Sequence, residues 1–99
     1  MKSIGIIEVV GVVAAVQALD SMTKASNVTF KTMEKKLGGR LVTIVVEGNV
    51  EDVQAAVEVG ARTSNSITNC AAHAVIPRPH EEVIALLEKS SEKFNYRRK

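Results

Sequence analysis

The chain has 99 residues, enough for one domain with a thin core, and domains of this size often bury more surface in oligomers. Aromatic residues make up 3% of it and the formal net charge is +2, which disfavours an aromatic-lined nucleobase or flavin pocket and gives no argument for nucleic-acid binding. The single cysteine excludes an internal disulfide and suits a reducing cytosol, and the sequence predicts neither a signal peptide nor a membrane helix.

The first half of the chain alternates between strand and helix patterns. Residues 3–10 are rich in Ile and Val on both faces, which predicts a central strand. Residues 12–25 follow the helical period instead. The stripe expected to be buried in that helix consists of Val12, Ala15, Val16, Leu19 and Met22.

Two further strands are predicted at residues 28–37 and 40–47. Gly38-Gly39 joins them into an antiparallel hairpin, because glycine reaches the positive φ values that such connections need. A second helix is predicted over residues 50–66. Asn49 is its expected N-cap, with Asp52 at the third helical position, close to a capping box.

The last predicted strand, residues 70–76, ends at Pro77-Arg78-Pro79, and a short third helix follows at 81–88. We therefore divide the chain into a domain of residues 1–88 and a loose polar tail of residues 89–99. The order β-α-β-β-α-β plus a C-terminal helix predicts an α+β, ferredoxin-like fold. Its four-stranded antiparallel sheet should carry the two main helices on one face.

The sequence offers no catalytic set. His73 and His80 lack partners at metal-ligand spacing, and Cys70 should point to the opposite face of its strand from His73. Glu8 interrupts an apolar strand, where a hydrogen-bonded structural role is favoured over catalysis. The glycine pair opens a strand, whereas phosphate-binding loops open a helix. We therefore predict no enzyme activity, metal or cofactor.

Five segments carry a family resemblance through their order and spacing. They are residues 4–11 (IGIIEVVG), 20–28 (DSMTKASNV), 38–43 (GGRLVT), 48–60 (beginning GNV) and 75–80 (VIPRPH). Together they resemble the hexamer-forming, single-domain shell proteins of bacterial microcompartments, such as those of propanediol utilisation, ethanolamine utilisation and carboxysomes. The resemblance covers about residues 3–88.

The resemblance implies a structural function rather than a catalytic one. Cyclic homohexamers would tile edge to edge with other shell proteins around encapsulated enzymes in the cytoplasm, with a central pore for small metabolites. The residues matching the hexamer edge are Lys24, Asn27, Arg78 and His80. The residues matching the pore loop are Lys36, Leu37, Gly38, Gly39 and Arg40.

Two departures from the family pattern bear on these roles. Arg40 stands where many relatives have a small residue, so six copies would raise the positive potential around the pore unless the side chains turn away. The segment Glu47-Gly48-Asn49 replaces an Arg and an Asp that relatives often carry, which alters a possible salt bridge between subunits.

Two other function classes remain open. A regulatory domain of the same topology could bind a small anion between subunits and would form an oligomer of fixed size without sheets or tubes. RNA binding through the sheet face would need aromatic residues on the two central strands, and the chain has none there.

Overall fold

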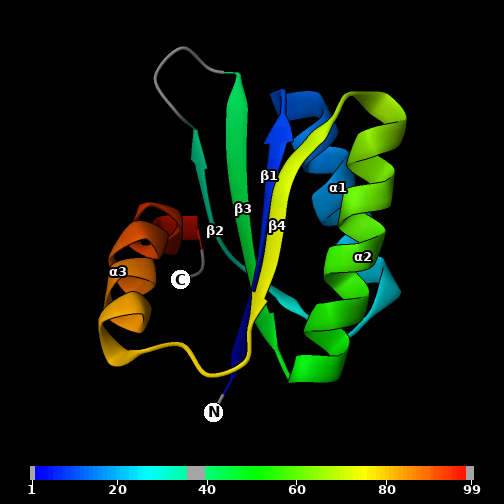
Figure 1. Cartoon of the computed structure of the whole chain (residues 1–99). Coiled ribbons are helices and arrows are strands. Elements are labelled where there is room, and N and C mark those ends of the chain that lie inside the picture. The colour runs from blue at the N-terminus through cyan, green and yellow to red at the C-terminus, as the bar shows by residue number, and fades with distance from the viewer. Residues whose placement is uncertain (1, 36–39, 98–99) are drawn as a thin grey trace.

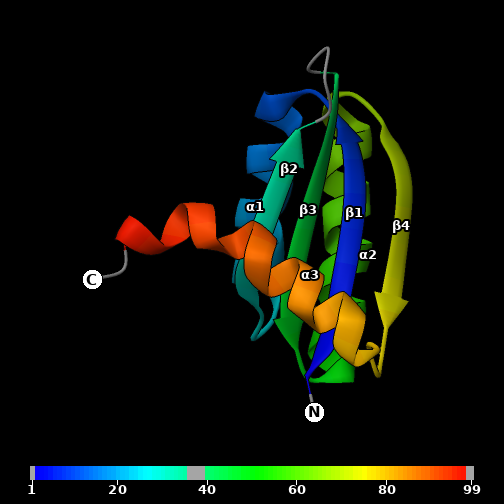
Figure 2. The ribbon, with the colours of Figure 1, turned by 90° about the vertical axis from the view of Figure 1, so that its left-hand side faces the viewer.

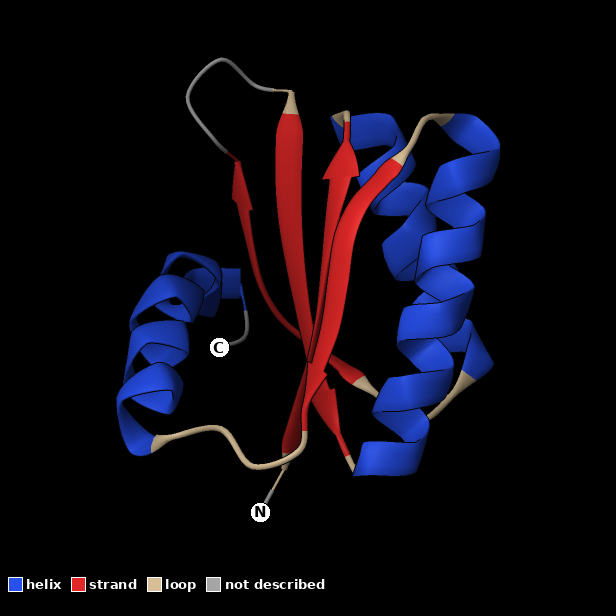
Figure 3. Ribbon diagram, in the orientation of Figure 1, coloured by secondary structure: helices blue, strands red, loops and turns tan. Residues whose placement is uncertain are grey.

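The computed structural model describes residues 2–35 and 40–97, with side chains to residue 94. The elements are β1 (Ser3–Val10), α1 (Val12–Ala25), β2 (Thr29–Lys35), β3 (Leu41–Gly48), α2 (Val50–Ile67), β4 (Cys70–Ile76), α3 (Glu81–Ser91) and a 3-10 helix, η1 (Glu92–Arg97). The strands form one antiparallel sheet in the order β2-β3-β1-β4 (Figures 1 and 3), which confirms the predicted α+β class and the central place of β1.

The molecule has three layers. Helices α1 and α2 lie side by side on one face of the sheet, and α3 lies on the other face, against β2 (Figures 1 and 2). A single hydrophobic core lies between the sheet and the α1–α2 pair, built from Val, Ile, Ala and Met. Its largest fully buried members include Ile7, Met22 and Ile44. The face opposite this core is only partly covered, because α3 extends over β2 more than over β1 and β4.

Helix α2 approaches the sheet closely because β1 carries a glycine beneath it. A Cβ at Gly5 would lie 2.7 Å from a methyl of Val57 and 2.8 Å from a methyl of Val53, both on α2. Gly60 plays a similar part between the helices, since a Cβ there would lie 2.7 Å from the sulfur of Met22. Real Cβ atoms do not sit at such distances, so a side chain at either position requires its neighbours to move: the valines of α2 for Gly5, and the flexible Met22 side chain for Gly60.

The predicted buried stripe of α1 is wrong for two of its five residues. Val12 and Val16 are 42% and 52% exposed, as is their neighbour Val13 at 70%. The buried residues of α1 are Ala14, Ala15, Ala18 and Met22. Small side chains line the contact because α1 packs tightly against α2, and the larger valines are turned out to solvent. In α2 the residues Val53, Ala56, Val57 and Gly60 are buried and Ala61 is half-buried.

The tail expected to be loose is helical for most of its length. Helix α3 runs on past Glu88 to Ser91, and η1 continues it to Arg97. Polar contacts hold this segment on β2: the hydroxyls of Thr32 and Ser90 lie 2.7 Å apart, and Lys31 pairs with Glu88. An alternating apolar pattern would not reveal docking of this kind.

Beside these contacts, Phe94 of η1 packs edge-on against Phe30 of β2, with ring centroids 5.0 Å apart. Ser90 Oγ donates a hydrogen bond to the Glu34 carboxylate, and the ammonium of Lys93 lies 2.8 Å from it. The hydrogen bond from Lys93, followed by that from Ser90, holds the pKa of Glu34 below its usual value. A division of the chain at residue 88 therefore cuts through a continuous helix, although the extent of the shell domain itself stays a prediction.

Candidate functional site

The sheet register places the ends of the elements at two opposite poles. Ser3 pairs with Gly48, Ile4 with Ile76 and Thr29 with Glu47, so the start of β1, the start of β2 and the ends of β3 and β4 meet at one pole. We call it the N-terminal pole, since the N-terminus lies there (Figure 1). The end of β2 and the starts of β3 and α1 lie at the opposite pole.

All four residues predicted for the hexamer edge come from segments at the N-terminal pole. Lys24 is in the last turn of α1, and Asn27 is in the turn between α1 and β2. Arg78 and His80 lie in the connection from β4 to α3. Lys24, Asn27, Arg78 and His80 are all exposed. The structure thus gathers residues that are up to 56 positions apart in the sequence at one end of the sheet.

Lys24 is bound within its own helix in this structure. Its ammonium lies 2.9 Å from the carboxylate of Asp20, one turn earlier, and its side chain remains 75% exposed. An exposed pair at this spacing contributes about 0.3–0.5 kcal/mol. Such a pair is weak enough for Lys24 to exchange Asp20 for a partner on another molecule.

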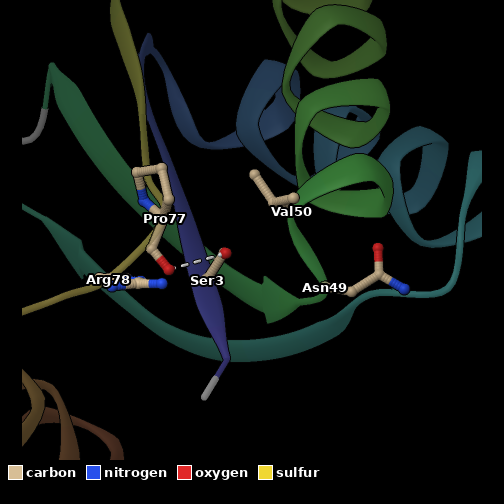
Figure 4. Close-up of a pocket in the computed structure, with 5 residues that line it drawn as sticks. All are labelled: Ser3, Asn49, Val50, Pro77 and Arg78. Carbon is tan, nitrogen blue, oxygen red and sulfur yellow. Dashed lines mark hydrogen bonds between the residues drawn. The ribbon is translucent and has the colours of Figure 1, made fainter.

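Arg78 lies beside an open depression of about 560 Å³ at the same pole (Figure 4). Its lining residues are Ser3, Asn49, Val50, Pro77 and Arg78. The buried Ser3 donates its hydroxyl to the carbonyl oxygen of Pro77 at 3.0 Å, which fixes the connection just before Arg78. Pro79, on the other side, is buried. Flanked by these two anchored prolines, the exposed arginine has a restricted backbone, because the residue before a proline has few allowed conformations.

His80 has a local partner. Its Nδ1 accepts a hydrogen bond from the backbone N–H of Glu82 at 3.1 Å, so the imidazole caps the N-terminus of α3. The residue therefore sets where α3 begins, besides lying at the pole where the edge is expected.

The turn after α1 is tied to the start of α2. Asn49 caps α2 as predicted, accepting the N–H of Asp52 at 2.9 Å. Ser26 Oγ donates to the carbonyl oxygen of Asp52 at 2.7 Å, and the backbone N–H of Asn27 donates to an Asp52 carboxylate oxygen at 3.4 Å. No sequence signal marks Ser3 or Ser26 as parts of this site, because both bonds join segments far apart in the chain.

Most of the predicted pore loop, Lys36, Leu37, Gly38 and Gly39, lies outside the described residues. Arg40, at the base of the loop, is exposed, and its carbonyl oxygen accepts the N–H of Gly11 at 2.7 Å. Gly11 has φ 93°, a conformation that favours glycine. The end of the loop is therefore anchored to the β1–α1 junction, at the pole opposite the edge residues.

Within the described part of the chain, no group of three or more His, Cys, Asp or Glu residues is placed to hold a metal ion. Cys70 and His73 were expected to point to opposite faces of their strand, which assumes regular alternation of side chains. A register shift between β1 and β4 interrupts that alternation between Cys70 and His73, so the expectation no longer follows.

Among the described residues, no helix has the length and hydropathy needed to cross a membrane.

A second depression, of about 210 Å³, lies on the sheet face that α3 leaves uncovered. It is lined by Ile6, Glu8, Thr43, Ala72, His73 and Ala74. Its lining is mostly apolar, with the half-buried Glu8 contributed by the central strand β1. A carboxylate among apolar groups disfavours an anionic ligand in this depression.

Comparison with known proteins agrees with the fold and the motifs. Residues 3–79 match the family model described as the BMC domain. The chain is 40% identical over 88 residues to the bacterial microcompartment shell protein PduA of Citrobacter freundii, covering 89% of this chain and 94% of that protein. It is 39% identical over 83 residues to the shell protein EutM of Salmonella typhimurium, covering 84% of this chain and 85% of the relative.

A carboxysome protein and a solved structure extend the comparison. The carboxysome shell protein CcmK2 of Synechococcus elongatus is 40% identical over 83 residues, with 82% of this chain and 80% of the relative covered. A crystal structure of a microcompartment protein from Desulfitobacterium hafniense shares the fold, with a TM-score of 0.78 at 23% identity. The match covers 91% of this chain and 48% of that one. The resemblance predicted from the sequence motifs is thus confirmed, and the chain belongs to the bacterial microcompartment shell protein family.

Proposed function

We propose that this chain forms a cyclic homohexamer that tiles edge to edge into a microcompartment shell layer and leaves a central pore for small metabolites. The observation that carries the proposal is the separation of the two poles. Segments at the N-terminal pole supply Lys24, Asn27, Arg78 and His80, while Lys35 and Arg40, on either side of the proposed pore residues, lie at the other pole. A hexameric tile needs this arrangement, with lateral contacts at its rim and the loop near its axis.

Two exposed apolar surfaces support a cyclic assembly. Val12, Val13 and Val16 form one on the first half of α1, near the pole opposite the N-terminal pole. The uncovered sheet face, with Ile6, Ala72 and Ala74, forms another. A ring is built from heterologous contacts, in which two different surfaces of each subunit meet. A chain with two separate apolar surfaces meets this requirement.

The proposed roles of individual residues follow from their positions. Lys24 and Arg78 would make the lateral contacts between hexamers, with Asn27 and His80 beside them. Lys36, Leu37, Gly38, Gly39 and Arg40 would surround the pore, where six exposed Arg40 side chains would favour anions. Like other shell proteins, the chain would act in the cytoplasm without catalysis, alongside other shell proteins and around encapsulated enzymes.

Mass and morphology, measured together, test the proposal. Light scattering should give the mass of six chains for wild type and for Lys24→Asp, and negative-stain microscopy of concentrated wild type should show sheets or tubes that Lys24→Asp lacks. Lys89→Asp, the same charge change at an exposed residue of α3, is the matched control and should tile normally. A stable dimer or trimer that forms no larger assembly would refute the tile and favour the regulatory domain.

A further inference from the structure

The sequence suggested that Asp52 completes the cap of its own helix, but its carboxylate serves another segment. One of its oxygens accepts the backbone N–H of Asn27, 25 positions earlier, at 3.4 Å. The carbonyl oxygen of the same residue accepts Ser26 Oγ at 2.7 Å. Two consecutive residues of the α1–β2 turn are therefore bound to a single residue in the first turn of α2.

Close packing accompanies these two bonds. A Cβ at Gly48 would lie 3.0 Å from the carbonyl oxygen of Asn27 and 3.3 Å from a methyl of Val28. Ser26 is the C-cap of α1 and has extended backbone angles, φ −155° and ψ 173°. The chain thus leaves α1 in an extended conformation and crosses directly over the β3–α2 junction, where the bonds to Asp52 hold it.

We infer that Asp52 is a positioning residue for the lateral contact between hexamers, an inference that rests on the proposed function. Lys24 lies two residues before Ser26, and Asn27 is itself bonded to Asp52. Asp52 orders the backbone that presents both edge residues and so reduces the conformational entropy lost when two hexamers meet.

The adjacent residue provides a matched control. Glu51 and Asp52 are both acidic residues in the first turn of α2, so each is favoured there by the helix dipole. Of these two described residues, Asp52 is the one whose side-chain oxygen accepts a hydrogen bond from the turn. Replacing either by alanine removes one negative charge near the helix N-terminus, whereas only the replacement of Asp52 releases Asn27. Asp52→Asn keeps an oxygen that can accept the same N–H.

The experiment uses the full chain as wild type, E51A, D52A and D52N. Light scattering at low concentration measures the hexamer mass, thermal unfolding measures the stability, and sedimentation measures the lowest protein concentration at which sheets form. We expect D52A to form hexamers and to raise that concentration about fivefold, equivalent to about 1 kcal/mol. D52N should stay near wild type, and E51A should match wild type.

The outcomes separate this inference from the proposed function. Wild type that forms no sheets refutes tiling itself, and the role of Asp52 with it. Wild type that tiles while D52A behaves like E51A refutes only the positioning role. Should D52A fail to fold, Ser26→Ala takes its place, since it removes the bond from Ser26 Oγ to the Asp52 carbonyl oxygen. Intact S26A hexamers that need a higher concentration to form sheets support the anchoring of the turn by Asp52, and a concentration equal to that of wild type overturns it. Loss of tiling in folded D52N hexamers overturns the role of the side-chain oxygen.

Discussion

Replacing Gly5 by alanine tests whether the close contact between β1 and α2 is needed. The new methyl would lie 2.7 and 2.8 Å from methyls of Val57 and Val53. Ordinary carbon contacts are about 3.5–4.0 Å long, so α2 must move away by about 1 Å. Valine is stiff at χ1, and both neighbours are buried, so neither can rotate aside without further cost.

The magnitude follows from two opposing effects. Overpacking a close-packed interior costs about 1–3 kcal/mol. Replacing a strand glycine recovers about 0.5–1 kcal/mol, because alanine has less conformational freedom to lose on folding. We therefore expect Gly5→Ala to lower the free energy of unfolding by about 1–2 kcal/mol in urea titrations followed by circular dichroism. Protein concentration must be held fixed, because subunit association contributes to the measured stability.

Gly60→Ala is the control for this prediction. Its methyl would meet the sulfur of Met22 at 2.7 Å and Cγ of the same side chain at 2.8 Å. Methionine is flexible and can move aside, and alanine in a helix gains about 1 kcal/mol over glycine. Gly60→Ala should therefore destabilise the protein less than Gly5→Ala. A Gly5→Ala variant as stable as wild type, or more stable than Gly60→Ala, would refute the argument from close packing.

Other predictions concern the outer surfaces. The pKa of Glu34 is lowered in the folded chain from its ordinary value of 4.5. The ionised carboxylate therefore stabilises the folded state at any pH above 4.5, and this contribution is lost as the pH falls through the lowered pKa. Thermal unfolding of Glu34→Gln between pH 6 and 3 should therefore show a weaker acid dependence than wild type, and equal slopes would contradict this. Phe94→Ala removes the edge contact with Phe30 and should speed amide exchange in η1 while leaving β1 protected, as hydrogen exchange would report. Val13 is 70% exposed, so Val13→Lys should not lower the stability of the monomer. The added charge should disrupt the proposed contact between subunits and lower the mass measured by light scattering. A variant that still has the mass of six chains would show that this part of α1 does not form the contact.

The sequence predicted the fold because local patterns and global topology agree. Ile and Val on both faces of residues 3–10 indicated a strand that is paired on both sides, and the capping signal at Asn49 gave the start of α2 to the residue. The helical period also gave both ends of α1. These features depend on neighbours in the chain, which a sequence displays directly.

The errors arose where tertiary contacts override a local pattern. Helix α1 shows its larger valines to solvent because tight packing against α2 selects Ala14, Ala15 and Ala18. Helix α3 continues past Glu88 because the Ser90 hydroxyl bonds to β2 and the ion pairs of Glu88 and Lys93 with β2, rather than an apolar stripe, hold the segment. The motif match located the candidate edge residues, but the bonds that fix their loops join distant segments and have no signature in a single sequence.

The opposite placement of the two poles has a consequence for how such a tile can diversify. In the proposed assembly, the strands act as a spacer between the loop that controls passage and the turns that set the lattice. Substitutions between Lys35 and Leu41 can then change what crosses the layer without changing the distance between neighbouring tiles. Variants with different transport properties could share one lattice, so permeability would be adjusted by the mixture of subunits rather than by redesign of the shell.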